Sequence, residues 1–178
     1  MHGSTRQTSR DRATPGTKPI VIAPEAGDLW ESAGSGVHWK IDGHHTGERF
    51  SVVHHPLAPR TLAAPLHFHH HEDEYSYVLQ GTLGALLGDE VVEAGPGTWV
   101  FKPRQQWHTF WNAGDTPCHI IEVISPAGFE EYFRDSARAW DEGDMEQIAR
   151  WNEKYGLDMD LESMPGLCER FGLVAPEP

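Results

Sequence analysis

The sequence predicts a mainly β fold, a small antiparallel barrel or sandwich, followed by a helical region. Between residues 20 and 125, short segments rich in β-branched and aromatic residues follow one another with no helix-length gap between them. Gly, Pro, Asn and Asp cluster at the junctions and mark turns. After residue 125 the apolar residues recur at helical spacing instead. Strands at this density are typical of antiparallel sandwiches and small barrels.

The strands are expected in the order in which the alternating segments occur. They comprise residues 19–24, 37–43, 47–59, 75–80, 82–87, 90–94, 98–102, 107–111 and 118–124. Gly88 and Asp89 stand alone between two of them, which predicts a two-residue hairpin turn.

Three helices are expected to follow. Ser125 is placed to cap the first, with Pro126 at its first helical position. Asp144 is placed to cap the second. Their expected bounds are 126–141, 144–155 and 165–171, with glycines at 156 and 172 as stops. We expect their aromatic residues to pack on the barrel as a cover. The predicted division is a disordered tail over 1–19, a barrel over 20–125 and a helical cover over 126–178.

Composition limits the classes of partner. With 178 residues the chain is the size of one domain. Its formal charge is −13, and because residues 1–19 carry +3, the remainder carries −16. Such an acidic body repels phosphate backbones, so no nucleic-acid partner is expected. No apolar run is long enough for a membrane span or a signal peptide, and two cysteines form no disulfide framework. These features predict a soluble, cytoplasmic protein.

A dense histidine cluster, HFHHHEDE, begins at His67. In a strand, residues two apart point the same way with Cα atoms about 7 Å apart, so His67 and His69 can reach one ion through bonds of about 2 Å. His71 shares their parity, and parity alone leaves it a candidate. Glu74 has the opposite parity, so it joins them only if the chain turns in between. That turn would make Glu74 the first inward residue of the next strand and place His71 in solvent.

A fourth donor comes from His108, in an apolar segment further along the chain. A lone histidine there is more often a core residue, but beside the upstream cluster it becomes a candidate ligand. Three imidazoles and one carboxylate suit one divalent transition metal ion, namely Fe, Ni, Co, Mn, Cu or Zn, and ligand type does not choose among them. Seven other histidines are expected at surfaces or strand edges, and no spacing assembles them into a site: His44, His45, His54, His55, His70, His71 and His119. Of these, His54 stays open because the direction of its strand is not readable.

Strand parity also suggests the surroundings of such an ion. The expected walls of a substrate pocket are Val78, Phe101 and Phe110. The opposite face of one strand would carry Tyr75, Tyr77 and Leu79. An outward aromatic row needs a cover, either the N-terminal segment or another subunit. We therefore expect a homodimer.

The two motifs together resemble the cupin family. HFHHHEDEYSYVLQG, from His67, looks like the first cupin motif, with two alternate histidines, a glutamate and a glycine seven residues later. GTWVFKPRQQWHTFWN, from Gly97, looks like the second, although Gln105 stands where a glycine is usual. The resemblance implies a jelly-roll barrel, or double-stranded β-helix, with a metal bound through His67, His69, Glu74 and His108. More loosely, the chain is similar to bacterial single-domain cupins related to quercetin 2,3-dioxygenase.

The second resemblance implies a metal-dependent dioxygenase that cleaves a flavonol or a related oxygenated aromatic or enol compound with O2. Glu74 would then be both ligand and catalytic base, its basicity raised by dry surroundings. Two alternatives stay open: a non-oxidative isomerase, lyase or cyclase using the same site, and a barrel that binds a small molecule without converting it.

Overall fold

The computed structural model describes residues 18–174, so the tail predicted over 1–19 lies almost wholly outside the described residues. The strands are β1 (Leu29–Ser32), β2 (Ser35–Ile41), β3 (Ser51–Leu57), β4 (Leu66–His69), β5 (Asp73–Gln80), β6 (Leu83–Leu87), β7 (Glu90–Ala94), β8 (Trp99–Lys102), β9 (His108–Asn112), β10 (Cys118–Ser125) and β11 (Leu157–Asp160). The helices are α1 (Gly43–Thr46), α2 (Glu130–Glu142), α3 (Met145–Tyr155) and α4 (Ser163–Phe171).

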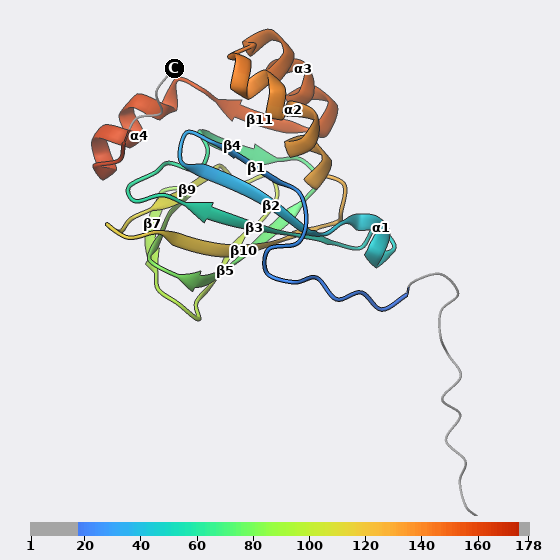
Figure 1. Cartoon of the computed structure of the whole chain (residues 1–178). Coiled ribbons are helices and arrows are strands. Elements are labelled where there is room, and N and C mark those ends of the chain that lie inside the picture. The colour runs from blue at the N-terminus through green and yellow to red at the C-terminus, as the bar shows by residue number, and fades with distance from the viewer. Residues whose placement is uncertain (1–17, 175–178) are drawn as a thin grey trace, which may run out of the picture.

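Two antiparallel sheets face each other and form a jelly-roll barrel (Figure 1). The larger sheet has the strand order β1-β2-β3-β10-β5-β8, and the smaller has the order β11-β4-β9-β6-β7. Burial alternates along β3, β5 and β10, since successive side chains point to opposite faces of a strand. One face of the larger sheet is therefore interior and the other exterior.

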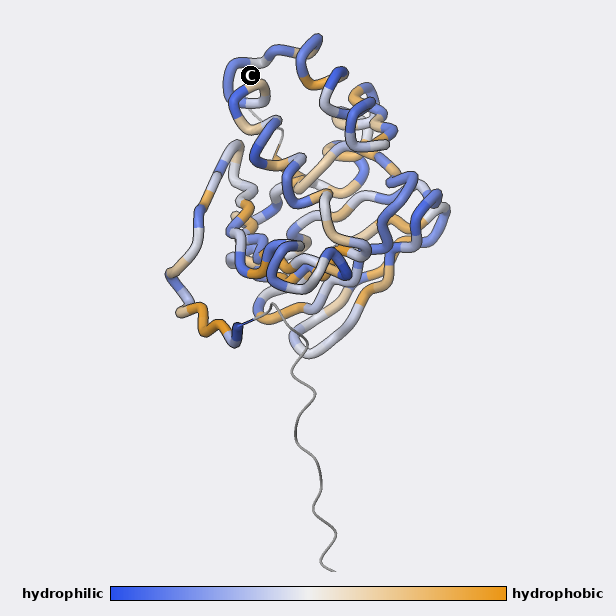
Figure 2. The backbone as a smooth tube through the Cα atoms, turned by 90° about the vertical axis from the view of Figure 1, so that its right-hand side faces the viewer, coloured by the Kyte–Doolittle hydropathy of each residue, from blue (hydrophilic) through white to orange (hydrophobic). Residues whose placement is uncertain are grey.

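The interior of the barrel is divided between an apolar half and a half that carries polar groups. The apolar half is filled by Leu57, Val78, Leu83, Ala85, Ala94, Val100, Phe110, Cys118 and Ile120. Hydrophobic residues are concentrated in the barrel strands, whereas the helices alternate between both kinds (Figure 2). On the other face of the smaller sheet, Gly84 leaves room for Trp111, because a Cβ at residue 84 would lie 2.2 Å from Trp111 Nε1.

The chain after β10 forms a cover over one end of the barrel. In Figure 1, α2, α3 and β11 lie together over this end, and α4 lies to one side. Trp39 in β2 donates its indole N–H to the carbonyl of Glu130 at 2.9 Å, which ties α2 to the larger sheet. β11 pairs with β4, with Leu157 opposite His69 and Met159 opposite His67. The cover therefore shares a sheet with the barrel.

Most of the predicted elements are confirmed. The hairpin at Gly88 forms as expected, and Leu87 lies opposite Glu90 across it. The second and third helices are present, and Asp144 caps α3 by accepting a hydrogen bond from Gln147 N at 3.0 Å. The mainly β class with C-terminal helices is thus the observed class.

Two local predictions are wrong, and some short elements were not predicted. Residues 19–24 form no strand. Instead, Lys40 Nζ donates hydrogen bonds to the carbonyl oxygens of Pro24 and Ala26, at 2.6 and 2.8 Å. Ser125 does not cap a helix: it ends β10, its hydroxyl donates to Arg49 O, and α2 begins at residue 130. β1, α1 and β11 were not predicted, because each has only four residues and so too short a pattern to detect.

Candidate functional site

The backbone brings the two sequence motifs together at the covered end of the barrel. His67 in β4 lies directly opposite His108 in β9. The chain turns after His69, and β5 then starts at Asp73, so that Glu74 points inward. Glu74 is 4% exposed, whereas His71 is exposed to solvent. The predicted turn is therefore confirmed, and with it the placement of His71 outside.

Backbone carbonyls orient two of the three inward imidazoles. His67 Nδ1 donates to Pro65 O at 2.8 Å, and His108 Nδ1 donates to Gln106 O at 2.9 Å. A carbonyl only accepts, so each Nδ1 carries the proton and each Nε2 presents a lone pair. Hydrogen bonds of this kind are the usual second layer around metal-binding histidines.

The donor atoms of His67, His69, Glu74 and His108 all lie within 4.8 Å of one another, and all four residues are buried. The Nε2 atoms of His69 and His108 each lie 3.4 Å from a carboxylate oxygen of Glu74, and neither has a hydrogen-bond partner. Buried polar atoms are normally paired. One ion held at about 2 Å from each donor would satisfy them. The four residues therefore fit a metal ion.

The protonation of the histidines suits this role. Burial lowers the pKa of His67 well below its ordinary value, and the neighbouring His108 and His69 lower it further. Burial likewise lowers the pKa of His69 to about 4, although Glu74 acts in the opposite direction. Both rings are therefore neutral near pH 7. Metal binding requires the neutral imidazole, so no proton has to be removed first.

A buried lysine lies next to the carboxylate ligand. Lys102 Nζ is 2.9 Å from Glu74 Oε2 and 2.7 Å from Glu122 Oε2, and Ser76 donates to the same Glu122 oxygen at 2.8 Å. Burial by itself raises the pKa of Glu74, but Lys102, His69 and His108 together hold it well below its ordinary value. The expectation that dry surroundings make Glu74 more basic is therefore wrong.

The second carboxylate on Lys102 behaves differently. Burial raises the pKa of Glu122 to about 7, and the attraction to Lys102 offsets only part of this effect. For Lys102 itself, burial lowers the pKa, yet Glu122 and Glu74 together leave it raised. The ammonium group stays charged and is shared by two carboxylates. This arrangement holds Glu74 in the ionised form that a metal requires.

A further carboxylate, Glu72, lies behind the cluster. Its Oε2 atom is 3.8 Å from His69 Nδ1, too far for a hydrogen bond, and both atoms lack partners. Burial raises the pKa of Glu72 to about 7. A small movement of this turn residue would complete the carboxylate–histidine pair that is common behind metal ligands.

A cavity of about 170 Å³ opens in front of the cluster. His67, His69 and Glu74 form its polar end. Its other walls are mainly apolar and come from Trp30, Val37, Leu62, Phe129, Phe133, Trp140 and Met159. Phe129 also packs edge-on against the His69 ring, with centroids 4.3 Å apart. Residues of the helical cover thus shield the site from much of the bulk water.

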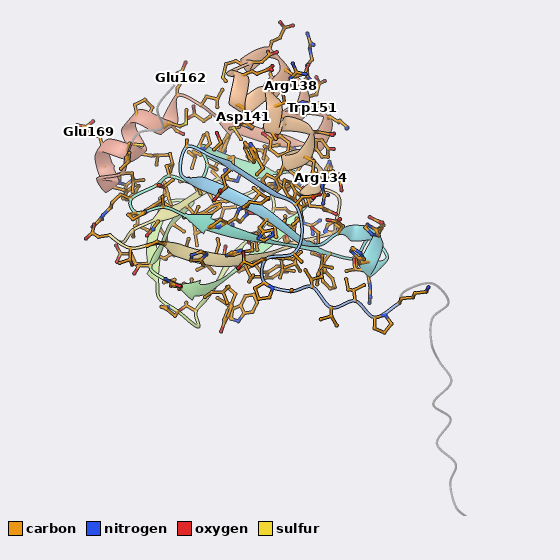
Figure 3. All side chains as sticks on the ribbon, in the orientation of Figure 1. Arg134, Arg138, Asp141, Trp151, Glu162 and Glu169 are labelled. Atoms are coloured by element: carbon orange, nitrogen blue, oxygen red, sulfur yellow. The ribbon has the colours of Figure 1, made fainter. Side chains whose placement is uncertain are left out.

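Trp30, which lines the cavity, is hydrogen-bonded to the helical cover. The indole N–H of Trp30 in β1 lies 3.1 Å from Asp141 Oδ1 in α2. Figure 3 labels Asp141 on the part of α2 above β1. The cavity therefore has a wall that depends on β1 and α2 staying together.

The predicted pocket walls are only partly correct. Phe110 lines the cavity, whereas Val78 points inward but belongs to the apolar core. Phe101 is 50% exposed and stacks on Tyr75 outside the barrel, with ring centroids 4.9 Å apart. The prediction for Phe101 is wrong because β8 directs Val100 and Lys102 inward, which leaves the alternate residues Trp99 and Phe101 outside.

The outward row predicted on β5 is present and extends onto β8. Tyr77 lies beside Trp99, with ring centroids 4.7 Å apart, and Leu79, Trp99 and Phe101 are exposed. Such a contiguous apolar surface is typical of an interaction site. The homodimer stays a prediction, which the mass of the protein in solution would test.

Sequence reasoning missed two residues near the site. Lys102 shares a strand face with the buried Val100, and this alternation could have placed Lys102 inside. Because lysine is charged, it was not expected there. His55 lines the cavity, whereas His54, the residue left open as a candidate, faces outward beside His119. The alternation along β3 separates these two histidines, but it does not say which of them is inside.

Comparison with known families finds a match in the part of the chain that carries the site. Residues 53–124 match the model of the family described as "Cupin domain". This segment includes all four residues of the metal-fitting cluster. The match and the jelly-roll architecture together support the cupin superfamily.

Solved structures of other proteins share this fold at low sequence identity. KdgF from Halomonas sp. aligns with a TM-score of 0.57 and 16% identity over 64% of this chain and 99% of its own. A predicted oxalate decarboxylase from Thermotoga maritima aligns with a TM-score of 0.56 and 18% identity over 60% and 99%. Streptomyces Pac13, described as a nucleoside dehydratase, aligns with a TM-score of 0.51 and 16% identity over 64% and 88%. These likenesses show the fold alone.

One curated relative is similar in sequence. The tetracenomycin polyketide synthase protein TcmJ of Streptomyces glaucescens is 32% identical over 60 residues, which make up 34% of this chain. The match spans about 40% of the length of that relative. Among residues 18–174, no helix has both the length and the apolar character needed to cross a membrane.

Proposed function

We propose that this protein is a metal-dependent dioxygenase that acts on a compact, oxygenated aromatic or enol compound. The observation that carries the proposal is the mainly apolar cavity that ends at His67, His69 and Glu74. Bound there, a divalent ion would act as a Lewis acid toward a phenol or enol oxygen. The apolar walls would exclude water and hold the ring of the substrate.

The size of the cavity narrows the substrate class. Pockets for drug-sized ligands measure about 300–1,000 Å³, whereas an engineered cavity of about 150 Å³ binds benzene. At about 170 Å³, this cavity is closer to the second case. A compound with one or two rings therefore fits better than a three-ring flavonol. The apolar walls also disfavour sugars and small dicarboxylates, which need many polar partners.

The residues of the chain divide the work. Glu74 remains the proposed catalytic carboxylate, in the role of an ionised ligand fixed by Lys102. The carbonyls of Pro65 and Gln106 hold two imidazoles in the tautomer that can bind. Phe129 packs on His69 and keeps bulk water from the cluster.

A non-oxidative lyase, isomerase or cyclase is the second candidate. It is favoured by the relative that is similar in sequence, since TcmJ is a polyketide synthase protein. The ketones of a polyketide chain can enolise, so such a compound would also offer an enol oxygen to the metal site. Consumption of oxygen separates this candidate from the first.

The test is oxygen uptake by protein reconstituted separately with Fe, Ni, Co, Mn and Cu, supplied with catechols and small hydroxylated enols. We expect uptake that matches substrate loss with one metal. His69→Ala should abolish the uptake, and His71→Ala, in the exposed turn, is the matched control that should retain it. Substrate loss without oxygen uptake would overturn the dioxygenase and favour the second candidate.

A further inference from the structure

His55 is a buried histidine on the inner face of the larger sheet, outside the metal-fitting cluster. Along β3 it shares a face with Val53 and Leu57, which are buried, and it is itself 5% exposed. Unlike these neighbours, it lines the cavity. A polar ring at this position needs partners for both nitrogens.

Only one of the two ring nitrogens has a partner in the described part of the chain. His55 Nδ1 lies 2.8 Å from the carbonyl oxygen of Gly36 in β2. Because the carbonyl can only accept, Nδ1 carries the proton and Nε2 is left as an acceptor. Nε2 has no hydrogen bond to residues 18–174, and it is not among the side-chain atoms sealed from solvent. The free acceptor therefore faces the cavity.

The neighbours of the ring keep it in this orientation. The rings of Phe110 and Phe133 pack against His55, each with a centroid distance of 5.8 Å, and the contact with Phe133 is edge-on. Neither aromatic ring can hydrogen-bond Nε2 as a conventional donor. The cavity thus carries a preset acceptor on one wall and the metal-fitting cluster at its polar end.

We propose that His55 Nε2 accepts a hydrogen bond from a free hydroxyl of the substrate while a second oxygen of the same molecule faces the metal-fitting cluster. The substrate class is then a compact aromatic or enol compound with two oxygen substituents, at least one of them an unmethylated hydroxyl. The inference rests on the proposed function only in requiring an oxygenated ligand in this cavity.

The electrostatic surroundings agree with an accepting role. Burial lowers the pKa of His55 to about 4; the hydrogen bond to Gly36 and the charge of Glu74 oppose this effect, and Lys102 adds to it. The ring is neutral near pH 7 and keeps its lone pair on Nε2. A hydroxyl can satisfy that atom, whereas a methyl ether in the same place leaves it unpaired.

Two substitutions separate acceptance of the substrate from a structural role. In His55→Asn, the amide N–H can replace Nδ1 on the Gly36 carbonyl, but nothing replaces Nε2. In His55→Gln, the longer side chain can place its carbonyl oxygen near the position of Nε2, at the cost of the Gly36 hydrogen bond. His55→Asn therefore keeps the hydrogen bond to Gly36, and His55→Gln keeps the acceptor that faces the cavity.

The experiment measures binding of a nitrocatechol and of its monomethyl ether to zinc-loaded protein by visible absorbance. Zinc has no redox chemistry, so the ligand is not consumed. We expect the wild-type protein to prefer the catechol by roughly 10-fold to 100-fold, the range that corresponds to one buried hydrogen bond. His55→Asn should lose that preference and His55→Gln should recover part of it, with zinc occupancy unchanged in both.

The opposite order of the variants would overturn the proposal. If His55→Asn keeps the wild-type preference and His55→Gln loses it, His55 is only a support for β2. A preference that survives in both variants would show that the metal alone selects the catechol, which also overturns it. Failure of the dioxygenase proposal would look different, because oxygen uptake would be missing while the discrimination of hydroxyl from methyl ether persisted.

Discussion

The two faces of the larger sheet carry histidines side by side but use them differently. On the outer face, His54 Nε2 and His119 Nδ1 lie 2.9 Å apart and share one hydrogen bond. His38 Nε2 lies 3.1 Å from the ammonium group of Lys40. On the inner face, the adjacent residue His55 binds a backbone carbonyl and leaves its second nitrogen free.

The difference shows that a site needs fixed and unshared lone pairs rather than many histidines. Outer-face imidazoles satisfy one another, and no group of metal-fitting donors in the described chain includes His38, His54 or His119. Across the cavity, backbone carbonyls accept hydrogen bonds from Nδ1 of His67 and of His108. The Nε2 atoms of these two histidines therefore stay unshared and converge. Burial then makes every unpaired atom costly, which favours a ligand.

The largest expected effect comes from breaking the inner-face ion pairs. Lys102→Met removes the only cation described beside Glu74 and Glu122, leaving two buried carboxylates without their partner. Loss of one partner from a buried ion pair costs about 3–5 kcal/mol. We expect a loss of this size in the free energy of unfolding, measured by denaturant titration of metal-free protein.

The outer face supplies the control for this variant. Lys40→Met should cost less, about 1 kcal/mol, because Lys40 is only half-buried and loses hydrogen bonds to the carbonyls of Pro24 and Ala26 rather than a buried ion pair. The double variant Lys102→Met/Glu122→Gln should lose less than the sum of its single variants, because the two residues interact directly. Equal losses for Lys102→Met and Lys40→Met would contradict the special position of the inner pair.

Metal affinity should distinguish the two faces next. His108→Ala removes one of four converging donors, so zinc affinity should fall by more than the roughly 10–100-fold lost when a second-layer partner is removed. His119→Ala, on the outer face, should leave zinc affinity unchanged. Competition with a chromophoric chelator measures both, and equal losses would refute the assignment of the cluster.

Acid stability compares the adjacent histidines of β3. The pKa of His55 is lowered by burial from 6.5 to about 4, so between these values the unfolded chain binds more protons than the folded protein. Above pH 6.5 the titration of His55 does not affect the free energy of unfolding. As the pH drops to 4, it lowers that free energy by up to about 3 kcal/mol. Denaturation of metal-free protein at pH 7 and pH 4.5 should show a smaller decrease for His55→Asn than for wild type.

His54→Asn is the matched variant on the outer face. The pKa of His54 is also lowered to about 4, by burial first and then by His119, His55 and His38. Because its ring is only partly buried, solvent screens the effect, and the change in pH dependence should be smaller than for His55→Asn. The raised pKa values of Glu72 and Glu122 change the pH dependence of stability in the opposite direction, in the wild type and in each variant. Only the difference between a variant and the wild type is therefore informative.

The smallest expected effect concerns the turn that supports the inner face. Gln105 has φ of 61°, the left-handed conformation that favours glycine, and its N–H donates to His69 O at 2.8 Å. Left-handed backbone costs a residue with a side chain roughly 1–2 kcal/mol, and the extra freedom of unfolded glycine offsets about 0.5–1 kcal/mol. Gln105→Gly should therefore raise the free energy of unfolding by less than about 1 kcal/mol without changing zinc affinity. A loss of stability would mean that the glutamine side chain makes a contribution of its own.

Much of the fold and the donor set could be predicted from local patterns. Runs of β-branched and aromatic residues between turn signals marked most strands from β3 to β10, and Gly88 and Asp144 marked a hairpin and a helix cap that the structure confirms. The spacing of His67, His69 and Glu74 required a turn, which is present. Even where Gln105 replaces the usual glycine, the backbone keeps the glycine-like conformation.

The sequence by itself determined which residues alternate, where the chain turns and which donors stand at metal-binding intervals, because these depend on neighbours along the chain. Tertiary structure decided which of two alternating sets faces inward. His55 rather than His54 reached the cavity, and Lys102 rather than Phe101 entered the barrel. A buried lysine is tolerable only because Glu74 and Glu122 approach it from other strands. Compensation of that kind comes from residues distant in sequence, so no local pattern can reveal it.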